Sequence, residues 1–333
     1  DLTTINGKTS VAVSLANVTE LTASSVSDLE ALAEDIEANE FSNATGLTTI
    51  AVSGATIEAD ALASIIDSYD EINGENNTTD MTLASGAKIN VASTEIEAML
   101  ADEEAGRLTI SDQNINVDNG TISVDTANDL DDTTSGTVTA AITTTESVTD
   151  LKTLTGTHAY TIVISGDDAD TSSADDLTTI NGKTSVAIDA SAITDLTEDT
   201  IDNIKTLLED GNDTNQFSAD SFSLLETVTV SDTTLDGSKL ASAIDEANEA
   251  TDGTTVVFTI SAANEIQGSE DDFTALITDD GNGQIDIDNQ DITVTSGTIS
   301  VDTANDLDDA TQGTVTADIT TTETVTDLKT LTG

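Results

Sequence analysis

The chain has 333 residues and a formal net charge of −57, from 65 acidic and 8 basic residues. Such acidity excludes nucleic acid and anionic membrane surfaces as partners, because both require lysine and arginine to meet phosphates. There is no cysteine and only one histidine, His158, which excludes disulfides, thiolate metal sites and histidine-rich zinc sites and leaves almost no room for a Ser–His–Asp triad.

Short strands and helices alternate in the first half of the predicted elements. Runs rich in Val, Ile and Thr indicate strands, and apolar residues spaced three and four apart indicate helices. Ser25 and Asp28 form a weak capping-box pattern at the start of the first long helix. In chain order we predict a strand at 11–15, a helix at 25–38, a strand at 49–53, a helix at 58–69, a strand near 81–83 and a helix at 95–100.

The second half follows the same order. Helical spacing is clearest at 197–211 and 235–250, where apolar residues recur on one face. His158 precedes a strand-like run and is interpreted as a residue of the turn before it. We predict strands at 137–142, 160–165, 186–190, 227–231, 255–261, 285–288 and 298–302.

Long stretches of the sequence occur twice. Residues 1–12 (DLTTINGKTSVA) return at 176–187, residues 120–132 (GTISVDTANDLDD) at 297–309, and residues 148–156 (VTDLKTLTG) at 325–333. Self-similarity of this kind is typical of repeat architectures. We therefore divide the chain into repeat unit 1 at 1–175 and repeat unit 2 at 176–333. The second unit is about nineteen residues short of a full period, and we expect the chain to be part of a longer array.

Strands that recur at an even spacing, each followed by a helical segment, favour parallel strands with right-handed crossovers. We predict an α/β repeat solenoid in which short parallel β-strands stack coil on coil with short helices between them. The alternative is an array of acidic β-sandwich modules, which would require mostly strands and few helices. Although the chain is acidic, 36% of its residues are hydrophobic and many lie in patterned runs, so it can bury a core. No segment approaches the ~20 apolar residues of a membrane span, and we expect no membrane insertion.

Two identical acidic stretches are candidate cation sites. Each copy of the 120–132 motif holds four carboxylates within eight residues. Oxygen ligands suit a hard cation such as Ca²⁺. The same aspartates would also cap a short helix and favour its N-terminal end. The candidate metal ligands are Asp129, Asp131, Asp132, Asp306, Asp308 and Asp309.

Residues 278–289 (TDDGNGQIDIDN) look like the middle of an EF-hand or dockerin calcium loop. Gly283 and Ile285 take loop positions six and eight, but Thr278 and Asn289 replace the carboxylates expected at positions one and twelve. We therefore interpret this segment as an acidic turn between a helix and a strand. A third acidic turn, with the same two interpretations, contains Asp167, Asp168 and Asp170.

The sequence gives no sign of catalysis. Paired carboxylates are too frequent here to indicate a glycosidase, only 2% of the residues are aromatic, and neither a Walker A nor a Rossmann glycine pattern occurs. We predict a protein that is not an enzyme and has no catalytic or cofactor-binding residues.

Four segments together resemble repeats of giant acidic cell-surface proteins of bacteria, especially marine cyanobacteria, including very large surface proteins linked to swimming motility. They are GTVTA at 136–140, VTDLKTLTG at 148–156, AYTI at 159–162 and DLTTINGKTSVAI at 176–188. The resemblance implies secretion, a cell-surface location and a structural or adhesive role. It supplies no catalytic residues.

From these observations we predict a structural repeat segment of a giant secreted surface protein, forming a rod or extracellular fibre that cations stabilise. The alternative is a calcium-dependent adhesin module that binds a glycan or another cell. The expected partners are neighbouring repeats of the same chain, further copies of it, and other surface polymers.

Overall fold

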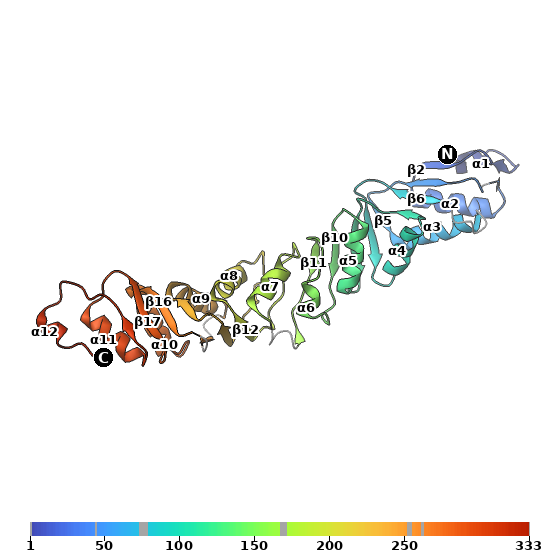
Figure 1. The fold of residues 1–333 in the computed structure, drawn as a ribbon. Helices are drawn as coiled ribbons and strands as arrows, with labels where there is room; N and C mark the ends of the chain where they lie inside the picture. Colours follow the sequence, from blue (N-terminus) through green and yellow to red (C-terminus); the bar gives the residue numbers. More distant parts are fainter. Residues whose placement is uncertain are drawn as a thin grey trace. The chain divides into compact units, whose positions relative to one another are not determined.

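The computed structural model describes residues 2–43, 45–72, 79–166, 172–251, 255–260 and 263–332. The chain forms two compact units: unit 1 is Asp1–Thr143 with Leu154–Thr161, and unit 2 is Thr144–Thr153 with Ile162–Gly333. Every strand pair among the described residues is parallel, and helices alternate with the strands (Figure 1). The chain is therefore mixed α/β, as predicted. The alternative of antiparallel sandwiches is wrong for these residues.

Unit 1 contains three parallel sheets, with the strand orders β2-β4-β6-β8, β5-β7-β9-β10-β11 and β1-β3. Neighbouring helices α2 and α3 pack against each other, as do α3 and α4 (Figure 1). The elements are α1 (Leu2–Asn6), β1 (Val13–Ser14), β2 (Glu20–Ser24), α2 (Val26–Glu37), β3 (Phe41–Ser42), β4 (Thr49–Val52), β5 (Thr56–Glu58), α3 (Ala59–Ile72), β6 (Asp80–Leu83), β7 (Lys88–Ala92), α4 (Ile96–Glu104), β8 (Leu108–Thr109), β9 (Asn114–Asn119), α5 (Val124–Thr133), β10 (Val138–Ala141) and β11 (Ala159–Thr161).

Unit 2 contains two parallel sheets, with the strand orders β12-β13-β15 and β14-β16-β17-β18. Its helices also pack in chain order, α7 on α8, α8 on α9 and α9 on α10. The elements are α6 (Val148–Leu151), α7 (Ala174–Asn181), β12 (Asp195–Asp199), α8 (Ile201–Gly211), β13 (Thr227–Val230), β14 (Thr234–Asp236), α9 (Gly237–Ala250), β15 (Val257–Thr259), β16 (Glu265–Ser269), α10 (Glu270–Gly281), β17 (Asp291–Ser296), α11 (Val301–Ala310), β18 (Val315–Thr316) and α12 (Val325–Leu328).

The core of each unit is a ladder of apolar side chains. In unit 1, Leu21 pairs with Ile50, Ile50 with Met81, and Met81 with Leu108, and all four are buried. Such partners lie roughly 20 to 32 residues apart along the chain, long enough for the crossover that a parallel pair requires. Each strand therefore buries its apolar side chain on that of the previous strand. The corresponding ladder in unit 2 is Leu196, Val228, Phe258 and Ile285, which are also buried.

Polar side chains form a second ladder on the strands. Asn116 Nδ2 donates to Asn90 Oδ1 at 3.1 Å, and Asn90 Nδ2 donates to Glu58 Oε1 at 2.8 Å. In unit 2, Thr293 Oγ1 donates to Glu265 Oε1 at 2.7 Å. Stacked amides and hydroxyls of this kind satisfy one another along a parallel sheet.

The helices begin where the sequence places a small hydroxyl residue. In eight of the described helices a Ser or Thr side chain accepts a hydrogen bond from the backbone N–H three residues further on, which fixes the first turn. The predicted cap at Ser25 is confirmed, with Asp28 N donating to Ser25 Oγ at 3.2 Å. The eight capping residues are Ser25, Ser123, Ser147, Ser173, Thr200, Ser269, Ser300 and Thr324.

Three predicted strands differ from the structure. Segments 186–190 and 285–288 form only isolated bridges, between Ile188 and Phe217 and between Phe258 and Ile285. The predicted strand at 298–302 is also wrong, because its first half forms only the isolated bridge between Ile299 and Ile319 and α11 begins at Val301. The side chain of Ser300 caps this helix and ends the extended backbone there.

Candidate functional site

The first acidic motif lies on α5 of unit 1. Asp129 and Asp132 are exposed, and Asp131 is half-buried. Three residues at these spacings cannot all lie on one face of a helix, because consecutive side chains point about 100° apart. Among the described residues, no three carboxylates that include any of these aspartates lie within 4.8 Å of one another. A metal site on α5 stays a prediction.

His158 takes up one of the three carboxylates. Its Nδ1 accepts a hydrogen bond from Val138 N at 3.2 Å, so the ring proton lies on Nε2, which donates to Asp131 Oδ1 at 2.5 Å. The ring also meets Tyr160 edge to face, with centroids 5.5 Å apart. His158 begins the segment that places β11 beside β10, and its side chain is 9% exposed. This geometry is that of a buried structural histidine.

The neighbours of Asp131 keep it ionised. Burial by itself would raise the pKa of Asp131, but the hydrogen bonds from His158 and Thr155 outweigh burial and hold its pKa below the usual range. An ionised Asp131 already accepts its hydrogen bonds from protein donors. Its interactions are therefore explained without a cation.

The second copy of the motif, on α11 of unit 2, has the same local structure. Asp306 and Asp309 are exposed and Asp308 is half-buried, and they too form no group of three carboxylates among the described residues. The motif instead makes a junction with the chain that follows it. Asn305 Oδ1 accepts from Thr332 N at 3.0 Å, as Asn128 Oδ1 accepts from Thr155 N at 2.8 Å in unit 1.

The described residues contain one group of three carboxylates that could share an ion, and it lies at the C-terminal end of α10 and in the turn that follows. Ligand oxygens of Asp280, Asp286 and Asp288 all lie within 4.8 Å of one another. Gly283 has a φ of 76°, which gives the tight turn expected at that position of a calcium loop. The sequence resembles a calcium loop here but lacks the expected carboxylates at Thr278 and Asn289. The three aspartates that converge lie between these two positions.

Hydrogen bonds shape this turn. Ile287 N donates to Asp280 Oδ1 at 3.2 Å, and Asp288 N donates to Asp286 Oδ1 at 3.0 Å. Asp279 lies next to Asp280 on α10. Burial raises the pKa of Asp279 to about 6, and the charge of Asp245 contributes secondarily. Oxygen ligands alone suit Ca²⁺ rather than a transition metal, and three carboxylates supply part of the six to eight oxygens that Ca²⁺ takes. The third predicted acidic turn, with Asp167, Asp168 and Asp170, lies outside the described residues.

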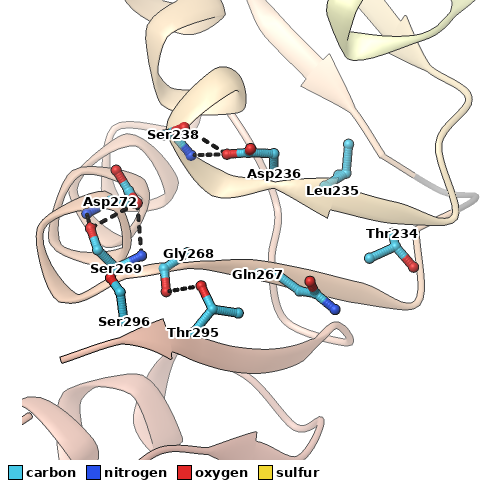
Figure 2. Close-up of a pocket in the computed structure, with 10 residues that line it drawn as sticks. All are labelled: Thr234, Leu235, Asp236, Ser238, Gln267, Gly268, Ser269, Asp272, Thr295 and Ser296. Carbon is cyan, nitrogen blue, oxygen red and sulfur yellow. Dashed lines mark hydrogen bonds between the residues drawn. The ribbon is translucent and has the colours of Figure 1, made fainter. Parts of the chain in front are cut away.

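A hollow of about 430 Å³ lies at the carboxyl ends of β14, β16 and β17, beside the N-termini of α9 and α10 (Figure 2). In parallel α/β sheets this is where phosphates bind. Here protein carboxylates occupy the helix N-termini. Asp236 Oδ1 accepts from Ser238 N at 3.0 Å, and Asp272 Oδ2 accepts from Ser269 N at 2.7 Å. The hydrogen bond from the Ser238 hydroxyl, above all, lowers the pKa of Asp236, so the hollow is negative and repels anions.

A comparison with protein-family models and with curated proteins returned no match for this chain. None of the described helices has the length and apolar character needed to cross a membrane. The assignment of function therefore depends on the repeated sequence and on the contacts described above.

Proposed function

We propose that this chain is a non-enzymatic structural repeat segment of a large secreted cell-surface protein, in which coils of strand and helix stack one on the next as an extended α/β solenoid. The observation that carries the proposal is the contact between each coil and the next one. Every strand in the ladders hydrogen-bonds to the strand of the next coil, and the apolar residues stack in register. Such an arrangement can grow by adding coils.

The duplicated junctions support this reading. Thr134 Oγ1 donates to Gln113 O at 2.6 Å, and its counterpart Thr311 Oγ1 donates to Gln290 O at 2.7 Å. These contacts tie the end of a helix to the preceding coil in each unit. Repetition of an identical coil-to-coil contact is what a building element requires, whereas a catalytic site needs to occur only once.

The acidic surface suits a chain held apart from its neighbours in a salty medium. Like charges repel within a Debye length of about 8 Å at physiological ionic strength, and salt or divalent cations relieve this repulsion. We therefore propose that cations stabilise the segment. We also propose that the segment lies outside the cell.

Two experiments test the structural role. Small-angle scattering of the 333-residue chain in about 0.5 M NaCl, where charge repulsion is screened, should give the profile of a rod, with a cross-section about as wide as one coil. A compact globular profile would refute the solenoid. On native cells, protease shaving followed by an antibody to DLTTINGKTSVA should detect an accessible polypeptide. A protected intracellular band would refute the surface location.

The second candidate is the calcium-dependent adhesin module, and the group Asp280, Asp286 and Asp288 favours it. We expect millimolar Ca²⁺ to raise the melting temperature of the wild-type chain relative to EDTA, because binding to the folded state alone stabilises it. Asp286→Asn should lose this response. Asp306→Asn, which changes a similarly exposed aspartate of α11, is the matched control and should keep it. A response lost in Asp306→Asn instead would place the site on α11, and no response in the wild type would exclude this form of the function.

A further inference from the structure

Two pairs of neighbouring helices, one in each unit, occupy equivalent places in the repeat. Residues 62–67 of α3 (LASIID) return on α9 as residues 240–245 (LASAID). In unit 1 α3 packs against α4, and in unit 2 α9 packs against α10. The α3–α4 contact and the α9–α10 contact can therefore be compared residue by residue.

The turns that follow α4 and α10 are equivalent as well. Arg107 N donates to Asp102 O at 2.9 Å, and Gln284 N donates to Asp279 O at 2.9 Å. Each turn thus places an aspartate at the end of its helix and a long side chain five residues further on. That long side chain is basic in unit 1 and neutral in unit 2.

In unit 1 the guanidinium of Arg107 joins the two helices. Its Nη1 lies 3.0 Å from Asp70 Oδ2 of α3, and its Nη2 forms an ion pair with Asp102 Oδ1 of α4. Asp102 is only 7% exposed. A carboxylate so far removed from water is costly unless it has a positive partner, and one arginine supplies that partner to both helices.

In unit 2 a pair of amides replaces the ion pair. Gln284 Nε2 donates to Asn248 Oδ1 at 2.6 Å. Asn248 follows the LASAID segment at the same spacing at which Asp70 follows LASIID. The amide pair carries no charge, so it joins the helices without neutralising Asp279.

Asp279, which is half-buried, is close to a second carboxylate instead. Burial first, and then the negative charge of Asp245 on α9, raise the pKa of Asp279 above its usual range. All eight lysine and arginine residues lie in the part of the chain that the structure describes, and none of them forms an ion pair with Asp245 or Asp279. The α9–α10 contact therefore holds two like charges and no base, whereas the α3–α4 contact holds an arginine.

We propose that the α9–α10 contact is a salt-responsive joint, which stays closed where dissolved salt screens Asp245 from Asp279 and opens locally where salt is removed. The inference rests on the proposed structural role, in which cations stabilise the segment, and it names a place in unit 2 where they act. Screening needs only mobile ions, so NaCl and KCl should act alike.

Screening changes strongly over the distance between two helices. The Debye length is about 20 Å in 0.02 M salt and about 4 Å in 0.5 M salt. Charges on helices whose axes lie roughly 8–10 Å apart therefore repel in the first solution and hardly at all in the second. Local opening of the contact exposes the backbone amides of α10 to hydrogen exchange.

Hydrogen exchange of the 333-residue chain, read by mass spectrometry at about pH 7.5 with EDTA, tests the proposal. EDTA keeps divalent ions away from the carboxylates in the turn after α10. Between about 0.02 M and about 0.5 M NaCl we expect exchange of α10 amides to slow about tenfold, and that of α4 amides by less than about threefold. Each rate is referred to the urea-unfolded chain at the same salt, which removes the effect of salt on exchange itself.

Three variants of unit 2 test the cause. Gln284→Arg supplies the base of unit 1 and should keep α10 protected in low salt. Asp279→Asn removes one of the two charges with little change of shape and should do the same. Gln312→Arg adds the same positive charge at an exposed glutamine and is the matched control, in which α10 should respond to salt as in the wild type.

Three results would each overturn the proposal: equal responses of α10 and α4 in the wild type, equal protection by Gln312→Arg and Gln284→Arg, or an unchanged response in Asp279→Asn. These readouts are local and do not depend on the shape of the molecule. A chain that scatters as a rod without the local difference keeps the proposed structural role and loses the joint. A globular profile with the expected exchange keeps the joint and loses that role.

Discussion

Replacing Gly136 by alanine tests whether successive coils touch through their backbones. A Cβ placed on Gly136 would lie 2.3 Å from Gln113 O and 2.6 Å from Gln113 C, where ordinary contact begins at 3.4 Å. At the equivalent Gly313 it would lie 2.3 Å from Gln290 O. The φ angle of neither glycine lies in the left-handed region, so the cost comes from the contact and not from backbone conformation. Alanine can be accommodated only if the two coils move apart by about 1 Å.

That displacement determines how much Gly136→Ala lowers the free energy of unfolding. It stretches the hydrogen bond from Thr134 Oγ1 to Gln113 O, now 2.6 Å, and the one from Thr137 N to Asn114 Oδ1, now 2.9 Å. Overpacking typically costs about 1–3 kcal/mol, and weakening a buried hydrogen bond adds about 1 kcal/mol. We therefore expect Gly136→Ala to lower the free energy of unfolding of unit 1 by about 3 kcal/mol, and Gly313→Ala to do the same for unit 2.

Urea denaturation followed by circular dichroism measures both changes, with the two units allowed separate transitions. Gly281→Ala is the matched control, because a Cβ there meets nothing within 4 Å and alanine favours the helix. It should change the free energy of unfolding by less than about 1 kcal/mol, in the stabilising direction. If Gly136→Ala is as harmless as Gly281→Ala, the close approach of coils through glycine is wrong.

Two other side chains give sharp predictions. His158→Ala removes the acceptor for Val138 N and the donor to Asp131, and should cost about 1–3 kcal/mol at pH 7. Because the pKa of Asp131 is lowered in the folded state, its contribution to stability is present above the unfolded pKa and is lost as the pH falls through the folded one. The cost of His158→Ala should therefore shrink once the pH falls below about 4, and a cost that stays the same there would contradict this. Phe222→Ala removes a completely buried ring, centred 5.2 Å from that of Phe217, and should lower the free energy of unfolding by about 3–5 kcal/mol. Leu224→Ala, at an exposed position, should leave it almost unchanged. Urea denaturation midpoints measure both changes.

The sequence predicted five of the described helices because their signals are local, although it missed the twelve-residue α10 (Glu270–Gly281). The predicted helix at 25–38 is α2 (Val26–Glu37), and the one at 235–250 contains α9 (Gly237–Ala250). In both, apolar residues at helical spacing coincide with a side-chain cap.

Eleven of the eighteen described strands were missed, and the reason is physical. β7 (Lys88–Ala92) and β9 (Asn114–Asn119) alternate buried isoleucine and valine with polar residues that are mostly half-buried. A search for continuous Val, Ile and Thr runs passes over them, although alternation with a period of two is itself a strand signal. Their polar side chains are satisfied by the neighbouring coil, as with Asn116 and Asn90, and a single segment cannot reveal that partner.

The acidic sites show where local reasoning ends. Asp129, Asp131 and Asp132 are close in sequence, yet a helix separates their side chains and His158 binds one of them. Asp280 and Asp286 converge because the chain turns back between them at Gly283. Density of carboxylates along a sequence therefore predicts a cation site poorly. What matters is whether a turn folds the carboxylates back on one another.

Helix N-termini explain how so acidic a chain folds with so few basic residues. Only six pairs of charged groups lie within 4 Å among the described residues, including the pair that involves His158. Many carboxylates instead accept hydrogen bonds from backbone N–H groups at helix starts, as Asp150 does from Ser147 N and Asp272 from Ser269 N. A helix N-terminus carries about half a positive charge, so each additional coil with a capped helix brings its own partner for a carboxylate. Acidity can then increase with the number of coils without a matching number of lysines, which is the condition for a long acidic array to stay folded.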